Sequence, residues 1–74
     1  MMYEMIREIF NQCSNNQMRD VFVSEVDTED TDSIARSFCT GASNTMSKEI
    51  LPNGTIIYEI NTDGLRQRLS FTPD

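Results

Sequence analysis

The sequence contains no histidine, and only two of its 74 residues are cysteine. Histidine is the usual base that activates a nucleophilic serine or cysteine, so its absence argues against that kind of catalysis. Two cysteines, Cys13 and Cys39, do not complete a structural zinc site, which takes four ligands. We therefore expect no enzymatic activity, no catalytic residues, no bound metal and no cofactor.

Basic residues are also scarce, since six lysines and arginines face twelve acidic residues and the net charge is −6. An acidic protein repels phosphate, so the expected partner is another protein and not nucleic acid. No apolar run approaches the roughly 20 residues that span a membrane. The N-terminal stretch MMYEMIREIF is interrupted by Glu4, Arg7 and Glu8, so we expect no signal peptide and no membrane contact. The expected location is cytoplasmic, with both cysteines as thiols.

The chain does carry enough patterned hydrophobicity for one small α+β domain over residues 1–74. From Met2 to Cys13, apolar residues recur at helical spacing, which predicts a first short helix. The alternative is a strand over residues 4–12 that pairs with Arg19 to Val26 and gives the order ββαβββ. The adjacent apolar pair Ile9 and Phe10 interrupts strict alternation and favours the helix.

The segment Arg19 to Thr28 is rich in valine and predicts a strand. Val21 and Val23 fall on one face of this strand, and Phe22 falls on the other. A strand with apolar side chains on both faces is typical of a central position in a sheet, or of one covered on both sides.

The end of that strand is acidic. Five carboxylates lie within nine residues: Glu25, Asp27, Glu29, Asp30 and Asp32. A calcium loop would also need a glycine and a late glutamate, which this stretch lacks. Carboxylates in the first turn of a helix are stabilised by its dipole, and Asp30 can cap it. We interpret the stretch as a strand end followed by a helix start, with contact to a partner as the second possibility.

Apolar residues after the acidic stretch have helical spacing and end at Gly41, which predicts a second short helix. The remainder predicts a three-stranded antiparallel meander over Thr45–Leu51, Thr55–Ile60 and Leu65–Thr72, with a turn at Pro52-Asn53-Gly54. Both helices should then pack on one face of a small antiparallel sheet. The expected core consists of Ile6, Ile9, Phe10, Val21, Val23, Ile34, Phe38, Ile56, Tyr58, Leu69 and Phe71.

The most distinctive local sequence is GLRQRLSFTPD, in which Arg66 and Arg68 project from the same strand face. Two such arginines can bind a carboxylate or a phosphate, or they can pair with Glu49 and Glu59 on the sheet surface. If this strand lies at an edge, it can also accept a partner strand. The candidate partner-binding residues are Arg66, Arg68, Glu25, Asp27, Glu29, Asp30 and Asp32.

Two stretches, REIFNQCSNNQMRDVFVSEV and TDGLRQRLSFTPD, resemble short acidic bacterial proteins of unknown function, a group that includes proteins carried on mobile elements. The resemblance covers most of the chain and implies a bacterial, cytoplasmic origin. It implies no activity and assigns no functional residue.

These observations favour a small non-catalytic protein-interaction or regulatory module. The first alternative is an acidic mimic of nucleic acid that inhibits a basic nucleic-acid-binding protein. The second alternative is a structural protein that forms homo-oligomers through an open sheet face.

Overall fold

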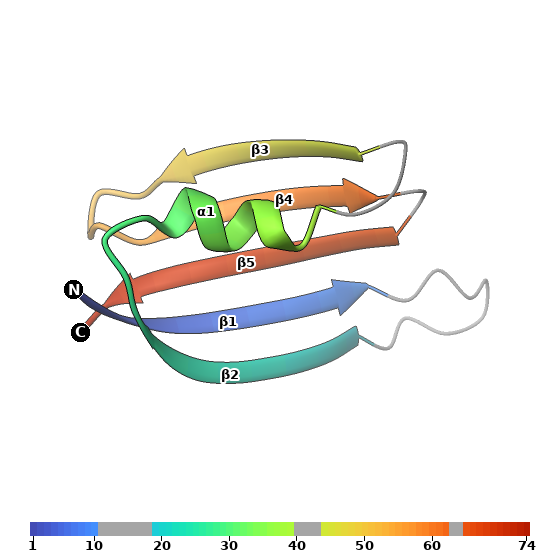
Figure 1. Ribbon diagram of the computed structural model, residues 1–74. Coiled ribbons are helices and arrows are strands. Elements are labelled where there is room, and N and C mark those ends of the chain that lie inside the picture. Colours follow the sequence, from blue (N-terminus) through green and yellow to red (C-terminus); the bar gives the residue numbers. More distant parts are fainter. Residues whose placement is uncertain (11–18, 40–43, 63–64) are drawn as a thin grey trace.

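The computed structural model describes residues 1–10, 19–39, 44–62 and 65–74, which form a five-stranded antiparallel sheet crossed by one helix (Figure 1). The sheet order is β2-β1-β5-β4-β3, so the first and last strands are neighbours. The elements are β1 (Met2–Phe10), β2 (Arg19–Asp27), α1 (Thr31–Ser37), β3 (Asn44–Ile50), β4 (Ile56–Thr62) and β5 (Leu65–Pro73).

The expected two-helix α+β architecture is wrong, because Met2–Phe10 is a strand and the chain follows the alternative order ββαβββ. β1 pairs with β2 on one side and with β5 on the other. Since successive side chains of a strand point to opposite faces, the neighbours Ile9 and Phe10 contribute one apolar group to each face. The spacing that suggested a helix arises from a strand with apolar residues on both faces.

β2 lies at an edge of the sheet, which contradicts the expected central position. Among the described strands it pairs only with β1, and all of its residues except Val26 are exposed. Valine and phenylalanine favour any pleated, half-buried surface, so their strand propensity does not report the number of neighbouring strands.

The helix after the acidic stretch is confirmed, and it is the only one in the described part of the chain. Asp30 is its N-cap, and the Asp30 carboxylate accepts a hydrogen bond of 3.2 Å from the backbone N–H of Ser33. Ala35 on the inner side of α1 is completely buried. The interpretation of the stretch as a strand end and a helix start is correct, since β2 ends at Asp27 and α1 begins at Thr31. Gly41, the expected helix terminator, lies outside the described residues.

The meander of β3, β4 and β5 is confirmed, as is the first of its turns. Gly54 has φ +90° and donates a backbone hydrogen bond of 3.0 Å to the carbonyl of Leu51. Asn53 Oδ1 accepts a hydrogen bond of 3.0 Å from the N–H of Thr55. A glycine is suited to this position because a side chain rarely tolerates a positive φ.

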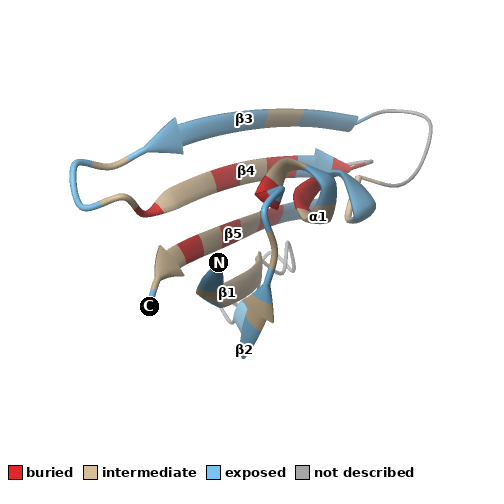
Figure 2. Ribbon diagram, turned by 60° about the vertical axis from the view of Figure 1, so that its left-hand side comes forward, coloured by how far each residue is buried: buried red, intermediate tan, exposed pale blue. Residues whose placement is uncertain are grey.

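The core lies between α1 and the central strands, where the fully buried segments of β4, β5 and α1 face one another (Figure 2). Tyr58, Leu69 and Phe71 are buried as expected, and the ring of Phe71 meets those of Tyr3 and Tyr58 edge to face. Three further core residues on the expected list pack against this cluster as partly buried groups: Ile34, Phe38 and Ile56.

The core prediction fails at the edge of the sheet and on the face away from the helix. Val21 and Val23 are 49% and 64% exposed because β2 pairs with only one of the described strands and the helix covers the other face. Ile6 and Phe10 on the face away from the helix are only partly buried, as is Ile9 on the helix side. The prediction also missed two fully buried residues, Ala35 and Ile60.

Candidate functional site

The two faces of the sheet differ, because α1 crosses one of them and no described element covers the other (Figure 1). We call the second one the open face. Its members follow from the pairing registers and the alternation of side chains. They are Met2, Glu4, Ile6, Glu8 and Phe10 on β1; Arg19, Val21, Val23, Glu25 and Asp27 on β2; Thr45, Ser47 and Glu49 on β3; Ile57, Glu59 and Asn61 on β4; and Arg66, Arg68, Ser70 and Thr72 on β5.

Arg66 and Arg68 lie together on the open face, as expected, and both reach Glu59 on β4. Arg68 Nε donates to Glu59 Oε1 at 2.8 Å, and Arg66 Nε lies 3.7 Å from Glu59 Oε2. The hydrogen bond that Arg68 donates to Glu59 raises the pKa of the Arg68 guanidinium above its ordinary value. The carboxylate therefore occupies the position that an anion from a partner would take on Arg68.

Both arginines also lie over the ring of Phe10, with guanidinium carbons 4.9 Å (Arg66) and 5.6 Å (Arg68) from its centroid. Phe10 reaches them because β1 pairs with β5, and Phe10 is opposite Arg66 in that register. β5 is therefore a central strand, and the suggestion that it could be an edge open to a partner strand is wrong.

Arg66, Arg68 and Glu59 form a charged row on the open face, and Glu8 extends this row across β1. It lies opposite Arg68, its side chain is only 14% exposed, and its Oε2 is 3.2 Å from Arg19 Nη1. Glu8 and Phe10 were not among the candidate residues. Their role depends on the pairing of the first strand with the last, which leaves no local signal in the sequence.

An apolar row runs beside the charged one. Val23 lies opposite Ile6, Ile6 opposite Ser70, and Ser70 opposite Ile57, so the row crosses four strands. Val23 is 64% exposed, while Ile6 and Ile57 are partly buried. The open face therefore carries uncovered apolar groups next to a network of paired charges.

A hollow of about 230 Å³ indents the open face near β3. Glu59 and Arg66 form part of its wall, together with polar side chains of β3 and β4. A cavity of this size can receive one side chain of a partner, but it is below the usual size of a small-molecule site, about 300–1,000 Å³.

The five acidic candidates do not form one site. Glu25 is on the open face, directly opposite Glu4 of β1, which places two like charges side by side. Glu29 Oε1 and Asp27 Oδ1 lie 2.6 and 3.0 Å from the N-terminal amine of Met1, and their hydrogen bonds raise its pKa. Asp30 is engaged in capping α1.

Asp32 lies on the helix side, where it joins Tyr58 and Lys48. The Tyr58 hydroxyl donates a hydrogen bond to the Asp32 carboxylate, and Lys48 Nζ lies 3.0 Å from it. These two contacts lower the pKa of Asp32, the hydrogen bond from Tyr58 being the larger cause. Burial raises the pKa of Tyr58, and its bond to Asp32 adds to that rise.

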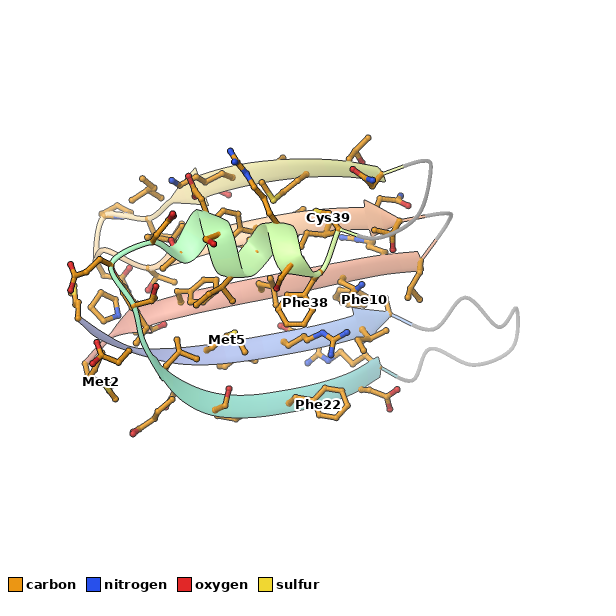
Figure 3. All side chains as sticks on the ribbon, in the orientation of Figure 1. Met2, Met5, Phe10, Phe22, Phe38 and Cys39 are labelled. Carbon is orange, nitrogen blue, oxygen red and sulfur yellow. The ribbon has the colours of Figure 1, made fainter. Side chains whose placement is uncertain are left out.

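On the helix side of β1, the guanidinium of Arg7 lies between two aromatic rings. Its carbon is 4.5 Å from the centroid of Phe38 and 5.8 Å from that of Phe22, and Nε donates to Gln67 Oε1 at 3.0 Å. Figure 3 shows Phe38 at the end of α1 and Phe22 on β2, on the same side of the sheet. Phe22 remains 52% exposed, so this aromatic group is open towards the edge.

The described residues contain no group of three or more cysteine, aspartate or glutamate side chains placed to hold a metal ion. Cys39 is a free thiol whose Sγ lies 4.0 Å from the sulfur of Met46, while Cys13 lies outside the described residues. In the part of the chain that the structure describes, no helix has the length and apolar character to cross a membrane.

Comparison of the chain with protein-family models, curated proteins and solved structures yields no match. The functional argument therefore depends on the open face and the edges of the sheet.

Proposed function

We propose that the protein is a small non-catalytic interaction module that binds another protein through the open face of its sheet. The observation that carries this proposal is the row of Val23, Ile6 and Ile57, which places an exposed valine and two partly buried isoleucines beside the charged residues of the open face. Apolar groups rimmed by polar ones are typical of protein-binding surfaces.

The charges of the open face specify the chemistry of the partner. The face carries six carboxylates and three arginines, and two of the arginines already contact Glu59. A partner with an apolar centre and a basic rim complements this arrangement, and its binding should weaken as salt screens the rim charges.

The positions of the acidic residues favour this module over the acidic mimic of nucleic acid. A mimic would present an uninterrupted row of carboxylates. Here arginines lie between the carboxylates of the open face. Asp30 caps the helix, and Asp32 contacts Tyr58 and Lys48, so neither carboxylate is on the open face.

A photo-crosslinking residue in place of Ile57 tests the proposal directly. On irradiation in cells that express the protein, it should attach one partner protein that the same residue in place of the exposed Arg36 on α1 does not attach. The identified partner is then titrated calorimetrically against the wild type, the open-face variant Ile57→Lys and the helix variant Ser37→Lys.

Both variants add one positive charge, so a difference between their affinities for the partner reports where the lysine lies and not the net charge of the protein. Ile57→Lys should weaken binding by about tenfold or more, because the change removes an apolar contact and opposes a basic rim. Ser37→Lys should leave the affinity unchanged. Equal effects of the two variants, or crosslinking from Arg36 alone or from neither position, would contradict the proposal.

A further inference from the structure

The two edges of the sheet are protected to different degrees. β3 carries the charged pair Lys48 and Glu49, and lysine on an edge discourages pairing with another strand. β2 contains neither lysine nor proline, and its register with β1 runs without a bulge over all nine residues. Its four charged residues lie towards the two ends of the strand: Arg19, Asp20, Glu25 and Asp27. The central residues of β2, Val21 to Ser24, are uncharged and exposed. β2 is therefore the edge that is open to strand addition.

We infer that β2 pairs with β2 of a second copy of this chain, antiparallel, with the two Phe22 residues directly opposite each other. This pairing uses the edge of the sheet and shares Val23 with the open face, while the proposed function is tested at Ile57 on β4, away from that edge, so the two can fail separately. It joins two five-stranded sheets into one sheet of ten strands.

The sequence of β2 is complementary to itself in this register. Antiparallel pairing about Phe22 places Val21 opposite Val23 of the second copy, and Val23 opposite its Val21, on the open face. The three apolar residues of β2 that are 49–64% exposed thus become neighbours of one another. The Phe22 pair lies on the helix side and extends the aromatic group around Arg7 across the junction.

The charges agree with the same register. Glu25 faces Glu4 within its own sheet, and no basic side chain of the described residues forms an ion pair with it. In the proposed pair, Arg19 of the second copy lies directly opposite Glu25, and the symmetry of the dimer supplies this contact twice. Arg19 is 57% exposed and can reach across while it remains near Glu8.

Neighbouring registers are less favourable. Pairing about Val23 would set Arg19 against Asp27, but it would place Val21 opposite Glu25, an apolar group against a charge, and leave Glu25 without a basic partner. Pairing about Val21 would place Arg19 opposite Val23 and Asp20 opposite Phe22, and it leaves Glu25 without a basic partner. A parallel arrangement in register would set every charge of β2 against its own copy, which costs free energy.

The first experiment measures mass by sedimentation from about 1 µM to about 1 mM, the range in which a small interface dissociates. The wild type should change from monomer to dimer with concentration. Val23→Lys places a charge at the centre of the pairing and should weaken the dimer by about tenfold or more. Val23 is mostly exposed, so the variant should fold normally, which circular dichroism checks. The matched control, Ser47→Lys on the exposed β3 edge, should dimerise as the wild type does.

The second experiment tests the register with charge exchange. Arg19→Glu sets a carboxylate against Glu25 of the other copy at both ends of the pairing, and it should weaken the dimer by about tenfold. The double variant Arg19→Glu, Glu25→Arg restores opposite charges at the same two places and should recover the dimer. If Arg19→Glu does not fold, because Glu8 loses its ion pair, the Val23→Lys and Ser47→Lys comparison still decides whether β2 is the interface.

A wild type that stays monomeric throughout the concentration range would overturn the inference. A dimer that persists in Val23→Lys, or that is lost in Ser47→Lys, would place the contact elsewhere on the molecule. A double variant that fails to recover the dimer, although it folds, would overturn the Phe22-centred register.

Discussion

At the scale of single residues, Tyr58 connects the helix, the sheet and two charges. Its ring lies in the core against Phe71, and its hydroxyl is 2.8 Å from Thr31 Oγ1 and also bonded to Asp32. Thr31 is the first residue of α1 and is itself buried. The hydroxyl therefore fixes the start of the helix on β4.

Removal of this hydroxyl should destabilise the fold without opening a large cavity. Tyr58→Phe leaves the Thr31 hydroxyl without its partner in a buried place, so the free energy of unfolding should fall by about 1–3 kcal/mol. Urea denaturation followed by circular dichroism measures the change. Tyr3→Phe is the matched control, because the Tyr3 hydroxyl makes no hydrogen bond within the described residues, and it should cost at most about 0.5 kcal/mol. Equal losses would show that the hydrogen bonds of Tyr58 contribute nothing.

The lowered pKa of Asp32 predicts how stability depends on pH. Its ordinary value is 3.8 and its folded value is lower, so the folded state binds the proton less tightly than the unfolded state. The resulting stabilisation is complete above the unfolded pKa and is lost as pH falls through the folded pKa. Asp32→Asn should therefore be less stable than the wild type at pH 7, and the difference should shrink below about pH 4.

Urea midpoints at pH 7, 4.5 and 2.5 measure this difference. Asp20→Asn is a suitable control, since it removes the same charge from an exposed site at the edge of the sheet and should show a smaller pH-dependent difference. A difference between Asp32→Asn and the wild type that is constant over all three pH values would contradict the assignment.

At the scale of elements, α1 is too short to be stable by itself, so its cap and its packing determine whether it forms. Asp30 could be predicted as a cap from sequence, since the preference for aspartate at that position is a local one. The edge position of β2 could not be predicted, because it depends on which strands pair, and its valines fit a central strand equally well. The strand β1 was missed for a related reason, since its two apolar faces reproduce the spacing of a helix.

The contribution of the Asp30 cap to stability can be measured with two substitutions. Asp30→Ala removes the acceptor for the Ser33 N–H and should lower the free energy of unfolding by about 1 kcal/mol. Asp30→Ser keeps a side-chain acceptor and should retain most of the stability. Thermal or urea unfolding distinguishes them, and equal losses in the two variants would show that the carboxylate acts only through its charge.

At the scale of the whole molecule, the sequence predicts the meander, the helix and one cluster of the site, Arg66 and Arg68 with Glu59. Each of these depends on residues close together in the chain. The remainder of the charged row could not be predicted, since Glu8 and Phe10 join it only through the β1–β5 register. The asymmetry of the two sheet edges is likewise a property of strand order and becomes visible only in the assembled sheet.

That strand order has a consequence for the way the chain folds. The β1–β2 hairpin and the β3–β4–β5 meander are two pieces with mostly local contacts, and the seam between them is the pairing of β1 with β5. Residues as distant in sequence as Tyr3 and Pro73 must meet before the seam closes. Folding should therefore be slow for a chain of this length, on the millisecond-to-second scale typical of non-local β topologies. During synthesis, the second edge of β1 remains exposed until the last strand has emerged.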